Sequence, residues 1–142
     1  YLCIMGRIMG IDYGQKRVGL AVSDPLRIFA IPLETLTVDK VTGFLKKYNE
    51  EQPIDLFVVG YPKHLNNTPA QNASRVTAFV THLQRTFPNI PVTLADERFT
   101  SKMAFQAMID GGVKKKDRRN KATIDKISAV IILQEYLQNN TP

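Results

Sequence analysis

Residues 7–24, RIMGIDYGQKRVGLAVSD, contain the pattern from which the fold can be predicted. Residues 7–12 alternate loosely in polarity, and residues 17–23 are rich in Val, Leu and Ala, so we predict two β-strands. The connection is short and contains Gly14, which can turn tightly, so the two strands are expected to form an antiparallel hairpin. The first strand ends on a carboxylate, Asp12, directly after an apolar run. That position requires an explanation.

The rest of the chain alternates strands with helices. A third strand is predicted at residues 28–36, where Pro32 is typical of a sheet edge or a bulge. A continuous apolar run at 56–59 indicates a strand buried on both faces, and a fifth strand is predicted at 92–95. Four helices are predicted by caps, proline and glycine signals: Thr37 to about Tyr48, Thr68–Pro69 to Phe87, Thr100 or Ser101 to Gly111, and Thr123 to about Leu137. Apolar residues at helical spacing predict the buried faces of two helices: Val41, Phe44, Leu45 and Tyr48 in the first, and Ala73, Val76, Val80, Leu83 and Phe87 in the second.

This order of elements predicts an α/β fold. The sheet would be mixed and five-stranded, with a three-strand antiparallel meander, two parallel strands, and helices on both faces. A length of 142 residues suits one domain, so we predict a single domain over 1–142. Within it we expect a flexible N-terminal extension at 1–6 and a mobile basic loop at 113–122.

Composition restricts the classes of function. Apolar residues make up 44% and charged residues 23% of the chain, which is typical of a soluble globular protein, and the net charge of +6 favours a polyanionic partner. The single cysteine, Cys3, excludes an internal disulfide and fits a reducing compartment, so we predict a cytoplasmic protein. No apolar run approaches the roughly 20 residues of a membrane-spanning helix, so no membrane partner is expected.

Acidic residues follow two predicted strands and start one helix. Asp12 ends the first strand, Asp96 and Glu97 end the fifth, and Asp125 lies in the predicted first turn of the last helix. If the two strands are parallel, their acidic ends open onto one sheet edge, where ligand sites of such sheets tend to lie. Carboxylate oxygens are ligands for hard cations such as Mg²⁺. Two such ions about 4 Å apart can activate water and stabilise the leaving oxygen in phosphodiester cleavage.

Each acidic position also has a structural explanation. Asp12 before a glycine is often a turn residue. Asp125 near a helix start is favoured by the helix dipole regardless of function. Asp96-Glu97-Arg98 is compatible with an exposed, ion-paired loop. The spacing is not a closed metal-binding motif, so only the joint placement of these residues favours a metal site.

Four blocks of sequence, taken together, are more specific than these separate positions. They are GIDYGQKRVGLAVSD at 10–24, VVGYP at 58–62, DERFTS at 96–101 and IDKISAVIIL at 124–133. Together the blocks resemble the YqgF (RuvX) family, in family order, over nearly all of residues 7–137. The resemblance implies an RNase H-like fold related to Holliday-junction resolvases. It also implies a hydrolase that matures the 5′ end of pre-16S rRNA in ribosome biogenesis, with a divalent metal, Mg²⁺ or Mn²⁺, as cofactor.

The resemblance also implies roles for particular residues. The catalytic metal ligands would be Asp12, Glu97 and Asp125, and Asp96 would support Glu97 at the metal. Two further residues would steady the loop or contact phosphate: Arg98 and Thr100.

The chain departs from the family pattern at three places. Asn66-Asn67 stands where the family usually has Asp-Gly, and asparagine tolerates the left-handed backbone region that such a turn needs. Tyr61 replaces the usual leucine, and Ser128 stands where alanine is usual. None of these changes removes a proposed ligand.

Basic and polar residues lie beside the acidic positions in sequence. A run from 114 to 126 is either a flexible clamp on a phosphate backbone or a solvated charge run, and we favour the clamp. Its seven basic residues are Lys114, Lys115, Lys116, Arg118, Arg119, Lys121 and Lys126. Residues after the fourth strand are predicted to position substrate: Lys63, His64, Asn66 and Asn67.

Three functions compete for this pattern. The first is a metal-dependent nuclease, acting on structured RNA such as pre-16S rRNA or, alternatively, on branched DNA as a Holliday junction resolvase. The second is an actin-like ATPase or sugar kinase, but those enzymes need two such domains and no P-loop motif is present. The third is a non-catalytic nucleic-acid-binding factor in transcription or ribosome assembly, which would not require all three acids. We expect a monomer or a weak homodimer.

Overall fold

The structure is a computed structural model that describes residues 6–14, 16–61, 70–96 and 121–139. In these ranges the chain forms one five-stranded sheet of order β3-β2-β1-β4-β5. The strands are β1 (Arg7–Tyr13), β2 (Arg17–Ser23), β3 (Ala30–Thr37), β4 (Ile54–Tyr61) and β5 (Val92–Asp96). The helices are η1 (Val38–Lys40), α1 (Val41–Glu51), α2 (Ala70–Thr86) and α5 (Lys121–Asn139).

The pairing of the strands confirms the predicted mixed sheet. β1, β2 and β3 form an antiparallel meander, whereas β4 runs parallel to β1 and β5 runs parallel to β4. β3 is an edge strand, and its register with β2 shifts between Leu20 and Ala21, where Ala21 pairs with Pro32. Pro32 therefore lies at an edge irregularity, because proline has no N–H for a ladder bond.

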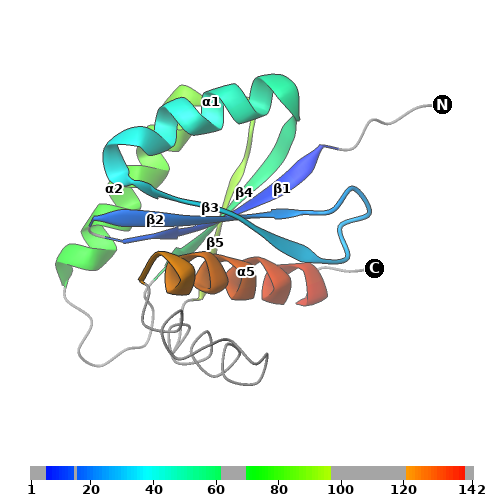
Figure 1. Cartoon of the computed structure of the whole chain (residues 1–142). Helices are drawn as coiled ribbons and strands as arrows, with labels where there is room; N and C mark the ends of the chain where they lie inside the picture. Colours follow the sequence, from blue (N-terminus) through cyan, green and yellow to red (C-terminus); the bar gives the residue numbers. More distant parts are fainter. Residues whose placement is uncertain (1–5, 15, 62–69, 97–120, 140–142) are drawn as a thin grey trace.

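Helices cover both faces of the sheet, as predicted. Figure 1 shows α1 and α2 on one face and α5 on the other. Alternate residues of β1 separate the two layers: Met9 and Ile11 are fully buried in the core with α1 and α2, while Ile8 belongs to the core beneath α5. In the described ranges, none of these helices is long and apolar enough to cross a membrane.

The predicted apolar stripes of α1 and α2 lie in the core except for Ala73, which is only partly buried, and the stripe of α2 has one addition. In α1, Val41 and Leu45 are fully buried. In α2, Leu83 is fully buried and the exposed fraction of Val76 is 3%. The stripe of α2 also includes Phe79, whose ring stacks on Tyr13 of β1 with centroids 4.2 Å apart. Tyr13 therefore packs against α2.

Two helix starts differ from the prediction. A 3-10 turn, η1, precedes α1, and Thr37 stands before it without a side-chain capping bond. α5 begins at Lys121, not at Thr123, so the last two residues of the predicted loop at 113–122 are helical. Asp125 consequently lies beyond the first turn of α5, which contains no acid. The helix-dipole explanation for Asp125 loses force, because that effect is confined to the first turn.

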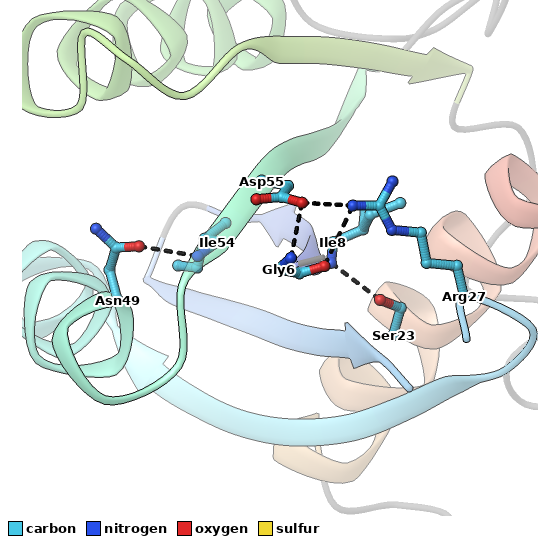
Figure 2. Close-up of polar contacts among 7 residues, drawn as sticks. All are labelled: Gly6, Ile8, Ser23, Arg27, Asn49, Ile54 and Asp55. Atoms are coloured by element: carbon cyan, nitrogen blue, oxygen red, sulfur yellow. Dashed lines mark hydrogen bonds and ion pairs between the residues drawn. The ribbon is translucent and has the colours of Figure 1, made fainter. Parts of the chain in front are cut away.

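The opposite end of the sheet is fixed by polar contacts around Gly6 and Asp55 (Figure 2). The Gly6 N–H donates to Asp55 Oδ2 at 2.8 Å, and the Arg27 guanidinium pairs with the same carboxylate. The N–H of Ile8 donates to the buried Ser23 hydroxyl at 2.9 Å. These contacts tie the start of β1 to β2 and β4, so the strand reaches its other end in a defined register.

Candidate metal centre

Asp12 stands next to last in β1 and faces the α5 side of the sheet. It shares this face with Gly10, because side chains alternate along a strand, and Gly10 lies against Leu133 and Ala129 of α5. In the antiparallel pair of β1 and β2, the residue opposite Asp12 is Gly19. The strand that follows the hairpin therefore places a residue without a side chain beside the carboxylate.

The missing side chain at Gly19 allows α5 to approach the sheet. A β-carbon built on Gly19 would overlap the main-chain oxygen of Asp125, and one on Gly10 would lie only 2.7 Å from Cβ of Leu133. Real β-carbons do not approach that closely, so both contacts require glycine. Asp125 and Asp12 are both immediate neighbours of Gly19, and the fold thus brings together two of the three predicted catalytic acids.

Asp125 is held by an ion pair with Arg17, the first residue of β2. Nε of the guanidinium lies 2.9 Å from Oδ2 of the carboxylate. The Arg17 side chain is 36% exposed and that of Asp125 is 24% exposed, so the pair is open to water on one side. The contact is therefore reachable by a ligand, and its stabilising effect is reduced by solvent screening.

The carboxyl ends of the parallel strands lie at the same edge as Asp12. β1 and β4 are parallel, and Asp96 at the end of β5 pairs with Tyr61 at the end of β4. The main chain of Asp96 thus reaches the edge that the sequence predicted for it. Glu97 is the next residue in the chain and lies outside the described residues.

Most of the other predicted substrate contacts also lie outside the described residues. They are Lys63, His64, Asn66, Asn67, Arg98, Thr100, Lys114, Lys115, Lys116, Arg118 and Arg119. Their predicted roles stay predictions. His82 is exposed on α2, and its Nε2 lies 2.8 Å from the Thr42 hydroxyl of α1.

The acids at this edge fit a hard divalent cation. Among the described residues there is no group of three or more His, Cys, Asp or Glu side chains that could hold a metal by themselves. Mg²⁺, however, is usually bound through one or two carboxylates together with water and substrate phosphate. Asp12 and Asp125, which both adjoin Gly19, would supply two carboxylates for such a partial shell.

Two residues of this site were not predicted from the sequence as functional. Gly19 and Arg17 are part of the block at 10–24, but nothing in a single sequence shows that a glycine lies under a helix. The sequence signal that could have linked Gly19 to Arg17 is the alternation of side chains along β2, which places both residues on the same face of the strand. Tyr13 lies on the opposite face, where burial raises the pKa of its phenol and the charge of Arg75 lowers it by a smaller amount.

Comparison with known proteins agrees with this geometry. A family model described as "RuvX: Holliday junction resolvase" matches residues 6–139. A relative from Parabacteroides distasonis is 53% identical over 95% of this chain and 96% of its own length. One from Phocaeicola vulgatus is 50% identical over 95% of this chain and 97% of its own. Both carry the name "Putative pre-16S rRNA nuclease".

Solved structures of low sequence identity share the fold. RuvC of Thermus thermophilus, solved in complex with Holliday junction substrate, has a TM-score of 0.54 at 17% identity and covers 95% of each chain. The fowlpox virus resolvase, solved with Holliday junction DNA, has a TM-score of 0.58 at 11% identity and covers 96% of this chain and 99% of its own. The RNase H-like fold implied by the sequence is confirmed. With its family model matched from the first strand to the last helix, the chain belongs to the RuvX family.

Proposed function

We propose that this chain is a metal-dependent nuclease that hydrolyses phosphodiester bonds and processes the 5′ end of pre-16S rRNA. One observation carries the proposal: Asp12 and Asp125, far apart in sequence, both adjoin Gly19 where the parallel strands of the sheet end. Membership of a resolvase family and relatives named as rRNA nucleases support the reaction class. A net charge of +6 supports a polyanionic substrate.

The proposed metal ligands are Asp12, Asp125 and Glu97, with Asp96 in support. A bound Mg²⁺ or Mn²⁺ supplies stabilisation of the charge that develops on the attacking water and on the leaving oxygen. Asp12 presents its carboxylate from a strand that is paired on both sides, so its position is fixed before substrate arrives. Asp125 presents its carboxylate from α5, where the Arg17 guanidinium holds one of its two oxygens.

Substrate binding would come from positive charge beside the acids. The basic residues between 114 and 119 are proposed to hold the phosphate backbone, and Lys63, Asn67, Arg98 and Thr100 to contact it near the cut. Such contacts position a strand without reading its sequence. Recognition of the rRNA precursor would then depend on RNA structure near the cleavage point.

Cleavage of branched DNA is the second candidate function. It is favoured by the description of the matching family as Holliday junction resolvases. Against it, relatives at about half identity over nearly the whole chain are named for pre-16S rRNA. The two substrates differ in the sugar and in the branch, so one enzyme preparation can be tested on both.

The test compares an RNA spanning the 5′ end of pre-16S rRNA with a four-way DNA junction. Each substrate is end-labelled and incubated with the chain in Mg²⁺, in Mn²⁺ and in EDTA. We expect metal-dependent cleavage of the RNA, with little cleavage of the junction and none by Asp12→Asn. Preferential cleavage of the junction would reverse the substrate assignment, and cleavage in EDTA by Asp12→Asn would remove the metal mechanism.

A further inference from the structure

The proposed function uses Nε of Arg17, which holds one oxygen of Asp125, but gives no role to the terminal nitrogens of the guanidinium. We propose that Arg17 joins the metal site to the nucleic-acid backbone, by positioning the Asp125 carboxylate through Nε and donating its terminal N–H groups to a phosphate oxygen. The inference rests on the proposed function, because it needs Asp125 as a metal ligand and nucleic acid as substrate. It adds a positioning and phosphate-binding residue to the site.

The ion pair between Arg17 and Asp125 involves one nitrogen of the guanidinium and one oxygen of the carboxylate. The hydrogen bond between them runs from Nε of Arg17 to Oδ2 of Asp125, at 2.9 Å. Arginine carries five N–H donors in a planar fork. In the described part of the chain, the Arg17 side chain has Asp125 as its only hydrogen-bond partner. Among the described residues, the terminal nitrogens of Arg17 and Oδ1 of Asp125 have no hydrogen-bond partner, so the first can bind an anion and the second a cation.

The backbone holds Arg17 at the edge where the acids lie. Its carbonyl accepts a hydrogen bond of 2.9 Å from Gly14 N–H, and its Cα pairs with Thr37 of β3. It shares the α5 face with Gly19, two residues further along β2. A guanidinium on a strand paired with β1 and β3 keeps its direction better than one on a loop, which suits a residue that positions another.

Charge and exposure indicate a ligand-directed role for this pair. An ion pair as open as this one, with side chains 36% and 24% exposed, contributes little to folding because water screens it. The planar fork of arginine, by contrast, matches phosphate oxygens, which is why arginine is favoured for phosphate recognition. Carboxylate ligands of metals are also commonly oriented by a second hydrogen bond. Arg17 can do both at once because the two tasks use different nitrogens.

The test uses Arg17→Gln with two readouts that do not depend on cleavage. The first is Mn²⁺ affinity without nucleic acid, from electron paramagnetic resonance of free Mn²⁺. The second is RNA affinity over a salt series, from fluorescence anisotropy with Ca²⁺ in place of Mg²⁺. We expect a Kd for Mn²⁺ about 10-fold higher. We also expect the slope of log K against log salt to fall by about 0.7, because one phosphate of a single strand is no longer neutralised.

Lys47→Gln is the matched control, because Lys47 is exposed on α1, across the sheet from α5. Lys47→Gln removes one positive charge, as Arg17→Gln does. It should leave the Mn²⁺ affinity unchanged and the slope of log K against log salt nearly unchanged. Should Arg17→Gln fold poorly, Arg17→Lys replaces it. The single ammonium group of lysine cannot contact Asp125 and a phosphate with separate nitrogens, as the guanidinium can. We therefore expect Arg17→Lys to lose either the Mn²⁺ affinity or the salt slope of the wild type.

Several outcomes would overturn the inference. Tighter Mn²⁺ binding in Arg17→Gln would mean that the guanidinium competes with the metal. An unchanged salt slope, or an equally reduced slope in Lys47→Gln, would remove the phosphate contact. These results differ from a failure of the proposed function, in which the wild-type chain itself binds no Mn²⁺ or Asp12→Asn binds it equally well.

Discussion

The main-chain oxygen of Asp125 lies so close to Gly19 that a β-carbon on the glycine would overlap it. This contact between α5 and β2 fixes how near the helix lies to the sheet. Because Gly19 is also the residue opposite Asp12, the same contact sets the spacing of the two acids. The proposed metal site therefore depends on a position that carries no functional group.

Gly19→Ala should damage both stability and metal binding. The added methyl group must push α5 outward, since the overlapping atom belongs to the main chain and cannot rotate away. Overpacking of this kind costs about 1–3 kcal/mol of unfolding free energy. Gly43→Ala is the control, because it lies in α1 with nothing within 4 Å of its added β-carbon. We expect it to stabilise by up to about 1 kcal/mol in urea unfolding. Equal effects of the two substitutions would contradict the close approach.

The two buried serines should respond in opposite directions to alanine. The Ser128 hydroxyl is buried and has no hydrogen-bond partner in the described structure, so Ser128→Ala should raise the unfolding free energy by about 1 kcal/mol. Ser23 is equally buried, but its hydroxyl accepts a bond from Ile8 N–H. Ser23→Ala should therefore cost about 1–3 kcal/mol. Chemical denaturation measures both, and a loss of stability in Ser128→Ala would show that its hydroxyl has a partner.

Asp24 should make folding sensitive to acid. Its carboxylate accepts backbone N–H bonds from Phe29 and Ile28, each 2.7 Å long, and the bond from Phe29 is the first cause that lowers its pKa. Stability from this group is complete above the ordinary value of 3.8 and is lost as pH falls through the lower folded pKa.

Asp24→Asn tests this behaviour. The variant should be less stable than the wild type at neutral pH, and the difference should shrink as pH falls below about 3.8. Unfolding free energies between pH 7 and pH 2.5 measure it. A difference that stays constant over this range would mean that the charge of Asp24 does not contribute.

Asp12→Asn should abolish cleavage without unfolding the chain. The amide keeps the shape of the side chain but removes the charge that binds Mg²⁺ or Mn²⁺, so cleavage should fall by at least about 100-fold. Circular dichroism should be unchanged. Glu50→Gln removes an exposed acid on α1 and should retain full activity. Wild-type cleavage rates in Asp12→Asn would exclude the metal site.

Neutralising the basic run should weaken RNA binding without changing its metal dependence. Glutamine at Lys114–Lys116 should reduce the salt slope by up to about 2, at roughly 0.7 for each phosphate that a lysine no longer neutralises. The control replaces two exposed lysines of α1, Lys46 and Lys47. A salt slope that stays at the wild-type value would mean that Lys114–Lys116 do not contact phosphate and are only a solvated charge run.

Local sequence determined most of the sheet. The strand at 17–23 has the predicted bounds, Pro32 lies at the predicted edge irregularity, and the apolar run at 56–59 lies inside central strand β4. These patterns are read correctly because alternation and burial act over a few neighbouring residues. The sequence also singled out Asp12 and Asp125 by their places at a strand end and near a helix start and by the family resemblance, and their role as metal ligands stays a prediction.

Tertiary structure decided what local pattern could not. The burial of Phe79 depends on packing against Tyr13 of the sheet, which overrides a weak spacing signal. The role of Gly19 depends on a helix that arrives about a hundred residues later in the chain. Sequence patterns alone show which carboxylates the chain carries and which of them follow a strand. Only the fold decided that Asp125 lies over Gly19 within reach of Arg17, because that contact joins elements with no local connection.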